Sequence, residues 1–223
     1  MKIGLVVLGV FLLASAALAD TISPCAVGPA AMSPAVRGTL GNPYDEVQQY
    51  GSAAQDFETA YDAYDIWVVS DFTTSEDYYC ETVIAQGFTN GGVDGVGANF
   101  HIYDGLPWAG GSIVMSASGG YDTLFSAGLI GADFGHQLLP AGSYYMVFQS
   151  VRELGTSGQS YIYQTSLGNN NDYHWNPGAG FGFTTTPILD ADSNPIDVNW
   201  QLVVTPEPSS LLLIAVALLL RRR

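Results

Sequence analysis

Three oxygen-bearing side chains at alternate positions near the end of the sequence have the spacing of calcium ligands. Asp190, Asp192 and Asn194 would stand at positions 1, 3 and 5 of a 12-residue calcium-binding loop, where carboxylate and amide oxygens bind the ion. Position 6 is Pro195 where a glycine is needed for the sharp turn, and position 12 is Gln201 where a bidentate glutamate is expected. The same residues also fit a hairpin turn before the last strand, and both interpretations stay open.

Aromatic and amide side chains gather in residues 169–176, which read Asn-Asn-Asn-Asp-Tyr-His-Trp-Asn. Tyr173 and Trp175 lie in this stretch, and Trp108 follows a Gly-Leu-Pro turn elsewhere in the chain. Exposed aromatic rings beside amide groups can stack on sugar rings and hydrogen-bond their hydroxyl groups. The pattern therefore predicts a carbohydrate contact through Trp108, Tyr173 and Trp175. The alternative is that the two tryptophans fill the ends of a β-sandwich.

The sequence has none of the common motifs that group catalytic or zinc-binding side chains. His101, His136 and His174 are single and far apart, without the paired spacing of a zinc site. The sequence has no Gly-x-Ser-x-Gly turn for a serine hydrolase, and no pair of carboxylates is singled out for glycoside hydrolysis. We therefore predict a protein that is not an enzyme and that has no cofactor other than the calcium considered above.

The chain has two cysteines, Cys25 and Cys80. In an oxidising compartment an even number of cysteines most simply forms a disulfide, which here would close a loop of about 55 residues. The chain-entropy model gives such a bridge a stabilisation of about 4 kcal/mol. Two free thiols are the alternative.

The last stretch of the sequence has three parts that a globular domain does not need. They are a proline–glutamate–proline triplet, an apolar run and a basic cluster, formed by Pro206, Glu207 and Pro208, by residues 211–220, and by Arg221, Arg222 and Arg223. The prolines keep the chain extended, so a helix begins only after the triplet. That helix is short against a hydrocarbon core of ~30 Å, and its arginines favour the cytoplasmic side of a membrane. A buried C-terminal core helix is the alternative.

This tail resembles the PEP-CTERM sorting signal of envelope-bearing bacteria. The resemblance covers residues 205–223 and implies recognition by a membrane-embedded exosortase, cleavage near the triplet, and delivery to the cell surface or the extracellular matrix. The short apolar run also fits a transient membrane anchor better than a permanent one. The chain would be the substrate of the sorting enzyme.

The N-terminus has the pattern of a secretory signal peptide over residues 1–19. Lys2 precedes an apolar run at residues 3–13, and Ala17-Leu18-Ala19 provides a small-x-small cleavage site. We expect export by the Sec machinery, with an uncleaved N-terminal anchor as the alternative. Both ends together predict an exported structural or adhesion protein of the cell surface or matrix. The alternative function is a secreted module that binds carbohydrate, or another ligand with the help of calcium.

Between its two ends the chain is strongly acidic. Of the 6 Lys and Arg residues, only Arg37 and Arg152 lie between the two targeting segments. Of the 21 Asp and Glu residues, all except Glu207 lie there. The body therefore has a net charge of 2 − 20 = −18. Such a surface repels phosphate backbones, which excludes nucleic acid as a partner, and it keeps an exported protein soluble.

Short runs of β-branched and aromatic residues, punctuated by glycines, fill residues 53–204. We predict strands at residues 66–69, 78–86, 99–103, 112–118, 121–126, 143–150, 159–165, 180–184 and 199–204. The absence of a long amphipathic helix favours an all-β fold, a single antiparallel two-sheet β-sandwich that is jelly-roll-like. Residues 20–52, rich in proline and glycine, are predicted to be an extended lead-in, and residues 205–223 form the sorting tail with its transmembrane-like helix.

Two details of the sandwich follow from the same patterns. Strict alternation along residues 78–86 places Cys80 on one face and Val83 on the other. Aromatic residues, with four tryptophans spread along the chain, are expected to dominate the core.

Four segments of the body read Gln-Asp-Phe-Glu, Ser-Asp-Phe, Ile-Tyr-Asp-Gly-Leu-Pro and Leu-Pro-Ala-Gly-Ser-Tyr-Tyr, at residues 55–58, 70–72, 102–107 and 139–145. Together they resemble a bacterial surface module. The similarity extends over residues 53–204 and implies a jelly-roll-like sandwich of the kind found beside PEP-CTERM tails. Ser70 stands where the module has the first aspartate of an acidic pair, so the resemblance carries over no role for such a pair and no catalytic residue.

Overall fold

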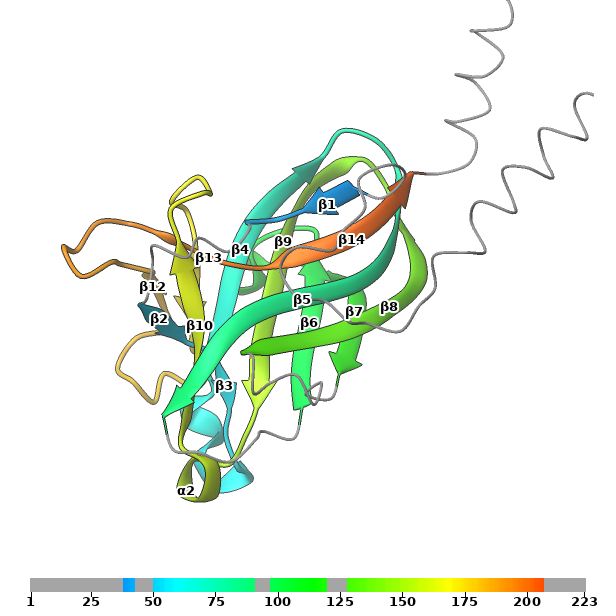
Figure 1. Ribbon diagram of the computed structural model, residues 1–223. Coiled ribbons are helices and arrows are strands. Elements are labelled where there is room, and N and C mark those ends of the chain that lie inside the picture. The colour runs from blue at the N-terminus through cyan, green and yellow to red at the C-terminus, as the bar shows by residue number, and fades with distance from the viewer. Residues whose placement is uncertain (1–37, 43–49, 91–96, 120–127, 207–223) are drawn as a thin grey trace, which may run out of the picture. The chain divides into compact units, whose positions relative to one another are not determined.

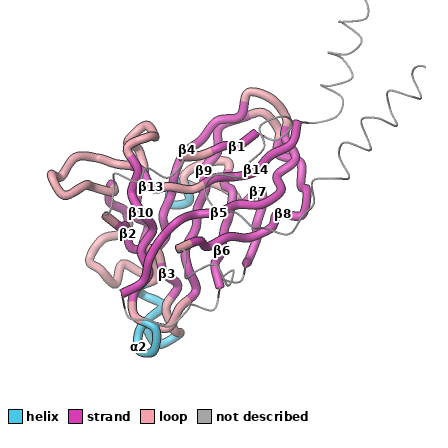
Figure 2. The backbone as a smooth tube through the Cα atoms, viewed as in Figure 1, coloured by secondary structure: helices cyan, strands magenta, loops and turns pink. Residues whose placement is uncertain are grey.

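The computed structural model describes residues 38–42, 50–90, 97–119 and 128–206, which are drawn in colour in Figure 1. They belong to one compact unit, Val36–Arg223, and consist mainly of strands, shown in magenta in Figure 2. The predicted all-β class is confirmed. The predicted signal peptide and the tail after Pro206 lie outside the described residues. Among the residues that are described, no helix has the length and apolar character to cross a membrane.

The first sheet has the order β1-β14-β5-β10-β13, with β2 also paired to β10 and β8 also paired to β5. Its strands are β1 (Gly38–Leu40), β2 (Gly51–Ala53), β5 (Tyr78–Asn90), β8 (Leu129–Leu139), β10 (Gln159–Thr165), β13 (Asp197–Val198) and β14 (Gln201–Pro206). All of these pairings are antiparallel. The long strand β5 pairs with β14 and β8 over most of its length and with β10 at its end.

The second sheet has the order β12-β11-β4-β9-β6-β7, with β3 also paired to β9. Its strands are β3 (Gln55–Asp56), β4 (Trp67–Thr74), β6 (Gly97–Tyr103), β7 (Ile113–Gly119), β9 (Gly142–Val151), β11 (Tyr173–Trp175) and β12 (Thr185–Pro187). Only β3 runs parallel to its partner among the described strands. Short helical turns are η1 (Thr59–Tyr64), η2 (Pro107–Ala109) and α2 (Leu154–Ser157).

The two sheets lie face to face, as the predicted sandwich requires, and their facing sides form the core (Figure 1). Phe100, Met146 and Phe148 from the second sheet and Leu202 from the first are completely buried there. The chain passes from one sheet to the other in the β2–β3, β4–β5, β5–β6, β7–β8, β8–β9, β9–β10, β10–β11 and β12–β13 connections. The prediction of two antiparallel sheets is therefore confirmed, with β3 as its parallel exception.

Tryptophan contributes less to the core than the sequence predicts. Trp200 is 1% exposed, packs edge-on against Phe72 at 5.2 Å between ring centroids, and donates from Nε1 to Ser70 Oγ at 2.8 Å. The other three tryptophans are only half-buried. Aliphatic residues and phenylalanines fill most of the core in their place.

The predicted strands agree with the structure in most places. Residues 159–165 match β10 completely, and the strands at 66–69, 78–86, 99–103, 112–118, 143–150 and 199–204 correspond to β4, β5, β6, β7, β9 and β14. Residues 180–184 do not form a strand, because they lie in the loop between β11 and β12. The predicted strands do not include β8, β11 or the short strands β1, β2, β3, β12 and β13. The strand predicted at 121–126 lies outside the described residues.

A β-bulge in β5 reverses the faces that strict alternation predicts. Cys80 and Val83 lie opposite Val204 and Leu202 of β14, so three steps along β5 match two steps along β14. The extra residue turns Cys80 and Val83 to the same side, where both are 0% exposed. The prediction that they lie on opposite faces is wrong, because alternation assumes an unbroken pleat.

Cys80 is a free thiol in the structure and points into the core. Burial raises the pKa of this thiol to about 12, and the neighbouring Glu81 carboxylate acts in the same direction. The structure therefore does not support the predicted disulfide to Cys25, which lies outside the described residues.

The described parts of the predicted lead-in belong to the sheet. β1 pairs with β14, and β2 pairs with β10. After β1, Gly41 has a φ of 105°, and a Cβ there would lie 2.6 Å from the carbonyl oxygen of Trp200. Asn42 then accepts a hydrogen bond from the Trp200 amide at 2.9 Å. Residues 38–42 are thus built into the sandwich.

The last strand reaches into the predicted sorting signal. β14 ends at Pro206, which pairs with Tyr78 of β5 and is the first residue of the proline–glutamate–proline triplet. A proline suits the end of a strand, since it has no N–H to continue the ladder. The sandwich and the triplet are therefore adjacent, with no intervening linker.

Candidate functional site

Aromatic side chains from several elements cover the outer side of the second sheet. They come from β4, β6, η2 and β11 and are Trp67, His101, Tyr103, Trp108, Tyr173 and Trp175. We call this group the aromatic face. The strand register explains it, because Trp67 pairs with Trp175 and Val69 with Tyr173, so these side chains point to the same side of the sheet. Every member is half-buried and keeps part of its ring in contact with solvent.

The rings of the strand residues are in contact across the sheet. The ring centroids lie 5.2 Å apart for Trp67 and His101, 6.2 Å apart for Trp67 and Trp175, and 6.5 Å apart for Tyr103 and Trp175. The two indoles are inclined by 36° to each other. Trp67, His101 and Trp175 lie side by side at 36° and 40° and form a platform, whereas Tyr103 stands at 84° to Trp175 at its edge.

Two valines beneath the rings show how completely they cover the sheet. Val69 and Val147 pair with each other on β4 and β9 and point to the outer side, yet both are 0% exposed. Their neighbours Val68 and Phe148 point into the core, as alternation requires. The rings therefore pack on the valines and are fixed in place by apolar contact.

The three residues predicted to contact sugar all belong to this face. The ring of Trp108 lies 5.5 Å from that of Tyr173, and Trp175 follows on the same side of β11. Residues more than sixty positions apart in the sequence are thus brought together. The sequence interpretation missed the other rings because they stand on β4 and β6, where the only signal was their position within alternating strands.

Amide and carboxylate groups border the aromatic face in the loop before β11. Asn169 Nδ2 donates to both carboxylate oxygens of Asp71, each at 3.0 Å, and Asn171 Nδ2 donates to Asp71 Oδ1 at 3.4 Å. The hydroxyl of Tyr173 donates to Asn171 Oδ1 at 3.1 Å. Both asparagines are exposed, so this polar edge offers hydrogen-bonding groups directly beside the rings.

A buried carboxylate fixes the shape of that loop. Asp197 is 0% exposed, and its two oxygens accept the backbone N–H groups of Asn170 and Asn171 at 2.7 and 2.8 Å. A Cβ at Gly168 would lie 1.7 Å from Asp197 Oδ2, so only glycine allows this approach. Asn170 has a φ of 60°, a left-handed conformation that asparagine tolerates. The polar edge is therefore pre-shaped by Asp197.

A second buried carboxylate lies beside the first. Asp172 is 2% exposed, and its Oδ2 accepts the Val198 N–H at 2.8 Å. Its Oδ1 has no hydrogen-bond partner of ordinary geometry among the described residues, although the Ser70 hydroxyl is near. Burial raises the pKa of Asp172 well above its usual value, and repulsion from the Asp197 carboxylate adds to this effect. Asp172 therefore holds its proton to a higher pH than an ordinary aspartate does.

No protein-family model matches the sequence, and no curated protein matches it. Partial likenesses exist among solved structures. One is the clostridial cysteine protease Cwp84 after propeptide cleavage, at 12% identity and a TM-score of 0.48, over 79% of this chain and 42% of that one. Another contains the cysteine protease and lectin-like domains of Cwp84, a surface-layer-associated protein of Clostridium difficile. There the identity is 12% and the TM-score 0.38, over 64% of this chain and 32% of that one. The chain thus spans less than half of either structure, and neither likeness identifies a function.

The predicted calcium ligands form a tight turn. Asp190 Oδ1 accepts the backbone N–H groups of Asp192 and Asn194 at 2.9 and 2.8 Å, and these hydrogen bonds lower the pKa of Asp190. Ser193 completes the turn with a φ of 68°. Within the described ranges, no group of three or more His, Cys, Asp or Glu side chains could hold a metal ion. The turn accounts for this composition, and calcium binding stays a prediction.

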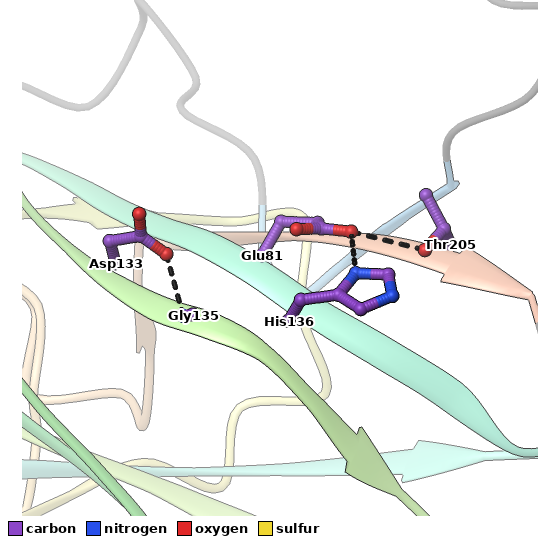
Figure 3. A network of polar contacts seen from close by, with 5 residues as sticks. All are labelled: Glu81, Asp133, Gly135, His136 and Thr205. Carbon is purple, nitrogen blue, oxygen red and sulfur yellow. Dashed lines mark hydrogen bonds and ion pairs between the residues drawn. The ribbon is translucent and has the colours of Figure 1, made fainter. Parts of the chain in front are cut away.

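A separate polar cluster lies where β5, β8 and β14 meet (Figure 3). His136 Nδ1 lies 2.6 Å from Glu81 Oε1, which also accepts the Thr205 hydroxyl at 3.2 Å. The imidazole stacks on the ring of Tyr79, with centroids 4.3 Å apart and planes inclined by 2°. His136 has a φ of 62° within an irregular part of β8, which lets its ring reach back over β5. The cluster ties the end of β14 to its neighbouring strands.

The other two histidines, His101 and His174, lie in more buried environments. Burial lowers the pKa of His174 to about 4, and its Nε2 has no hydrogen-bond partner in the described part of the chain. His101 belongs to the aromatic face, where burial lowers its pKa and its Nδ1 lies 2.8 Å from Ser116 Oγ. The ring of His174 is therefore neutral at pH 7.

Proposed function

We propose that the sandwich is a carbohydrate-binding adhesion module of an exported protein. The observation that carries this proposal is the aromatic face, a platform of half-exposed rings that adjoins the polar edge formed by Asp71, Asn169 and Asn171. Aromatic rings stack on the apolar sides of sugar rings, and neighbouring amides and carboxylates bind their hydroxyl groups. The face combines both groups on a rigid sheet.

The charge of the protein narrows the class of ligand. The body is strongly acidic, and Asp71 lies within the polar edge itself. A polysaccharide of uronic acids or sulfated sugars would meet electrostatic repulsion, whereas a neutral polysaccharide would not. We therefore propose a neutral polysaccharide of a bacterial surface or matrix as the ligand.

The test is binding of the purified protein to immobilised neutral and acidic polysaccharides, including matrix polysaccharide extracted from the producing bacterium. Trp108→Ala and Trp175→Ala are the informative variants. Loss of ~50 Å² of contact between a ring and the sugar lowers the binding free energy by about 1 kcal/mol. Each variant is therefore expected to weaken binding by about fivefold to tenfold. Asn171→Ala should weaken binding by removing a hydrogen-bonding group from the polar edge.

A matched control is Tyr64→Leu, which removes an exposed aromatic ring outside the face. It should bind polysaccharide like the wild type. The proposal fails if no polysaccharide binds, or if Trp108→Ala and Trp175→Ala both bind as tightly as the control.

We further propose that the protein is exported by Sec, sorted by an exosortase, and placed at the cell surface or in the extracellular matrix. Support comes from the signal-peptide pattern at residues 1–19 and the tail from Pro206 to Arg223. Because Pro206 ends β14, deletion should start at Glu207 so that the sandwich stays intact. Removal of residues 207–223, or Glu207→Ala, should leave the protein unprocessed or mislocalised in its native host. Normal processing and location of both variants would refute the sorting proposal.

A further inference from the structure

A small cavity lies outside the aromatic face, where η1, α2 and the loop before β12 meet. Its volume is about 270 Å³, and its lining is almost entirely apolar: Phe57, Tyr61, Tyr64, Leu154, Gln159 and Phe181. Ligand pockets for drug-sized molecules usually have ~300–1,000 Å³, so this cavity suits a single small group. In Figure 1 the turn η1, in cyan, lies beside α2.

Four aromatic rings make up most of the wall. Ring centroids lie 6.3 Å apart for Tyr61 and Tyr64, 5.3 Å for Tyr64 and Phe181, and 6.5 Å for Phe57 and Phe181. Successive rings are turned by 61°, 81° and 55°. Because the rings have different orientations, they form walls around the cavity instead of a stack. Tyr61, Tyr64 and Phe181 are 46%, 41% and 42% exposed, which is a high exposure for large rings.

A buried asparagine holds these walls together. Asn176 is 0% exposed, and its Nδ2 donates to the carbonyl oxygens of Ala63 and Asp65 at 2.9 and 2.7 Å. Its Oδ1 accepts the Phe181 N–H at 3.3 Å. The Gly180 N–H donates to Ala63 O at 2.7 Å, and a Cβ at Gly180 would lie 2.4 Å from that oxygen. The loop that carries Phe181 is therefore fixed against the turn that carries Tyr64.

The same turn is acidic. Asp56, Glu58, Asp62 and Asp65 all lie within ten residues of the chain. Burial raises the pKa of Asp65 to about 6, and the charges of Asp56 and Asp62 act in the same direction although the Phe57 N–H opposes them. The only Lys or Arg among the described residues is Arg152, which is 1% exposed and whose backbone N–H donates to Asp56 O. The segment that carries Tyr61 and Tyr64 therefore also carries four acidic side chains, of which Asp62 is exposed, and the described residues have no exposed Lys or Arg.

We propose that this cavity binds a small organic cation with a quaternary ammonium group. Aromatic faces attract such a cation through their quadrupoles, with ~0.5–2 kcal/mol for each good contact, and quaternary ammonium groups are the ligands that aromatic cages take most readily. Asp62 and Asp65 supply long-range attraction, while the rings replace the weakly bound water around the methyl groups. An anionic group would be repelled by the same carboxylates, so free choline should bind more tightly than phosphocholine.

The test is calorimetric or NMR titration of the full protein with choline, phosphocholine and 3,3-dimethylbutan-1-ol. The alcohol has the shape of choline but no charge, so it separates cation binding from simple apolar filling. Saturable choline binding is expected, with the alcohol about tenfold weaker and phosphocholine weaker than choline. Tyr64→Leu and Phe181→Leu should each weaken choline binding by about fivefold to tenfold, and Asp62→Asn by about twofold to threefold.

Two control variants separate this proposal from the carbohydrate-binding one. Tyr50→Leu changes a 57% exposed ring outside the cavity, and Trp108→Ala changes the aromatic face, so both should bind choline like the wild type. The proposal is overturned if choline does not saturate, if the neutral alcohol binds as tightly as choline, or if Tyr64→Leu and Phe181→Leu bind normally. The comparison of choline with the neutral alcohol uses only the wild-type protein, so it stays decisive even if a substitution disturbs folding.

Discussion

Replacing Asp172 with asparagine is expected to stabilise the fold, and the stabilisation is expected to grow with pH. Asp172 is 2% exposed and lies beside the Asp197 carboxylate, and burial raises its pKa well above the ordinary value of 3.8. An asparagine has nearly the same shape, and its Oδ1 can still accept the Val198 N–H. The variant therefore removes the titratable proton and keeps the main contact.

The magnitude follows from proton linkage. Well below pH 4 the side chain of Asp172 is protonated in both the folded and the unfolded chain, so it contributes no pH dependence to the stability. As pH rises above this value, the unfolded chain releases the proton while the folded chain retains it. The free energy of unfolding then falls by about 1.4 kcal/mol per pH unit, until the folded state also ionises. Asp172→Asn has no such proton to release, so its free energy of unfolding does not fall in this way. The difference in unfolding free energy between the variant and the wild type should therefore increase by about 1.4 kcal/mol per pH unit.

Urea unfolding followed by tryptophan fluorescence at about pH 4.5, 5.5 and 6.5 measures this difference, since Trp200 is buried in the core. Asp65 and His174 also change the stability of the wild type with pH, but their contributions cancel in the difference between the two proteins. Asp192→Asn, at an exposed turn position, is the matched control and should show no increase. A stability difference that stays constant over this range would mean that Asp172 ionises in the folded protein, and the assignment of the proton would be refuted.

Two further predictions concern the sandwich itself. Gly119→Ala should destabilise the fold severely, by more than about 3 kcal/mol in chemical unfolding, because its Cβ would lie 1.8 Å from the Gly131 carbonyl oxygen. Gly135→Ala, which has open space but a φ of 68°, should cost only about 1 kcal/mol, and equal losses in the two variants would contradict the geometry. Cys80 should resist alkylation in the native protein and react after denaturation without reductant, because its thiol is free but fully buried. A denatured, non-reduced protein that does not react until a reductant is added would restore the bridge to Cys25.

The sequence predicts strands well where the pleat is regular and poorly where it is interrupted. β10 was predicted completely because its residues alternate between defined turns. β8 was missed because Gly131 and Gly135 interrupt its pattern, and Gly135 and His136 both have positive φ in the structure. The bulge in β5 depends on pairing with β14, and pairing is a tertiary property that a local pattern does not contain.

The two candidate sites differ in the same way, because one could be predicted from local sequence and the other depends on tertiary contacts. Trp108, Tyr173 and Trp175 were chosen as candidates from residue type alone, because aromatic and amide side chains near turns are unusual enough to notice. The cavity could not be found in this way. Phe57 and Phe181 are separated by more than one hundred residues, and hydrogen bonds from Asn176 and Gly180 to the turn after Phe57 bring their segments together.

The buried carboxylates connect the stability of the fold to the proposed function. Asp197 and Asp172 fix the backbone at Asn170, Asn171 and Val198, so they shape both the polar edge and the entry to β11, which carries Tyr173 and Trp175. A fold selected for stability alone would not place two carboxylates side by side in its interior, since the second must keep its proton at a cost that rises with pH. Strain retained near a binding surface commonly serves to hold that surface in shape. We therefore expect Asp172→Asn to gain stability and to lose some affinity for polysaccharide. A variant that gains stability with unchanged affinity would instead separate the carboxylate pair from the aromatic face.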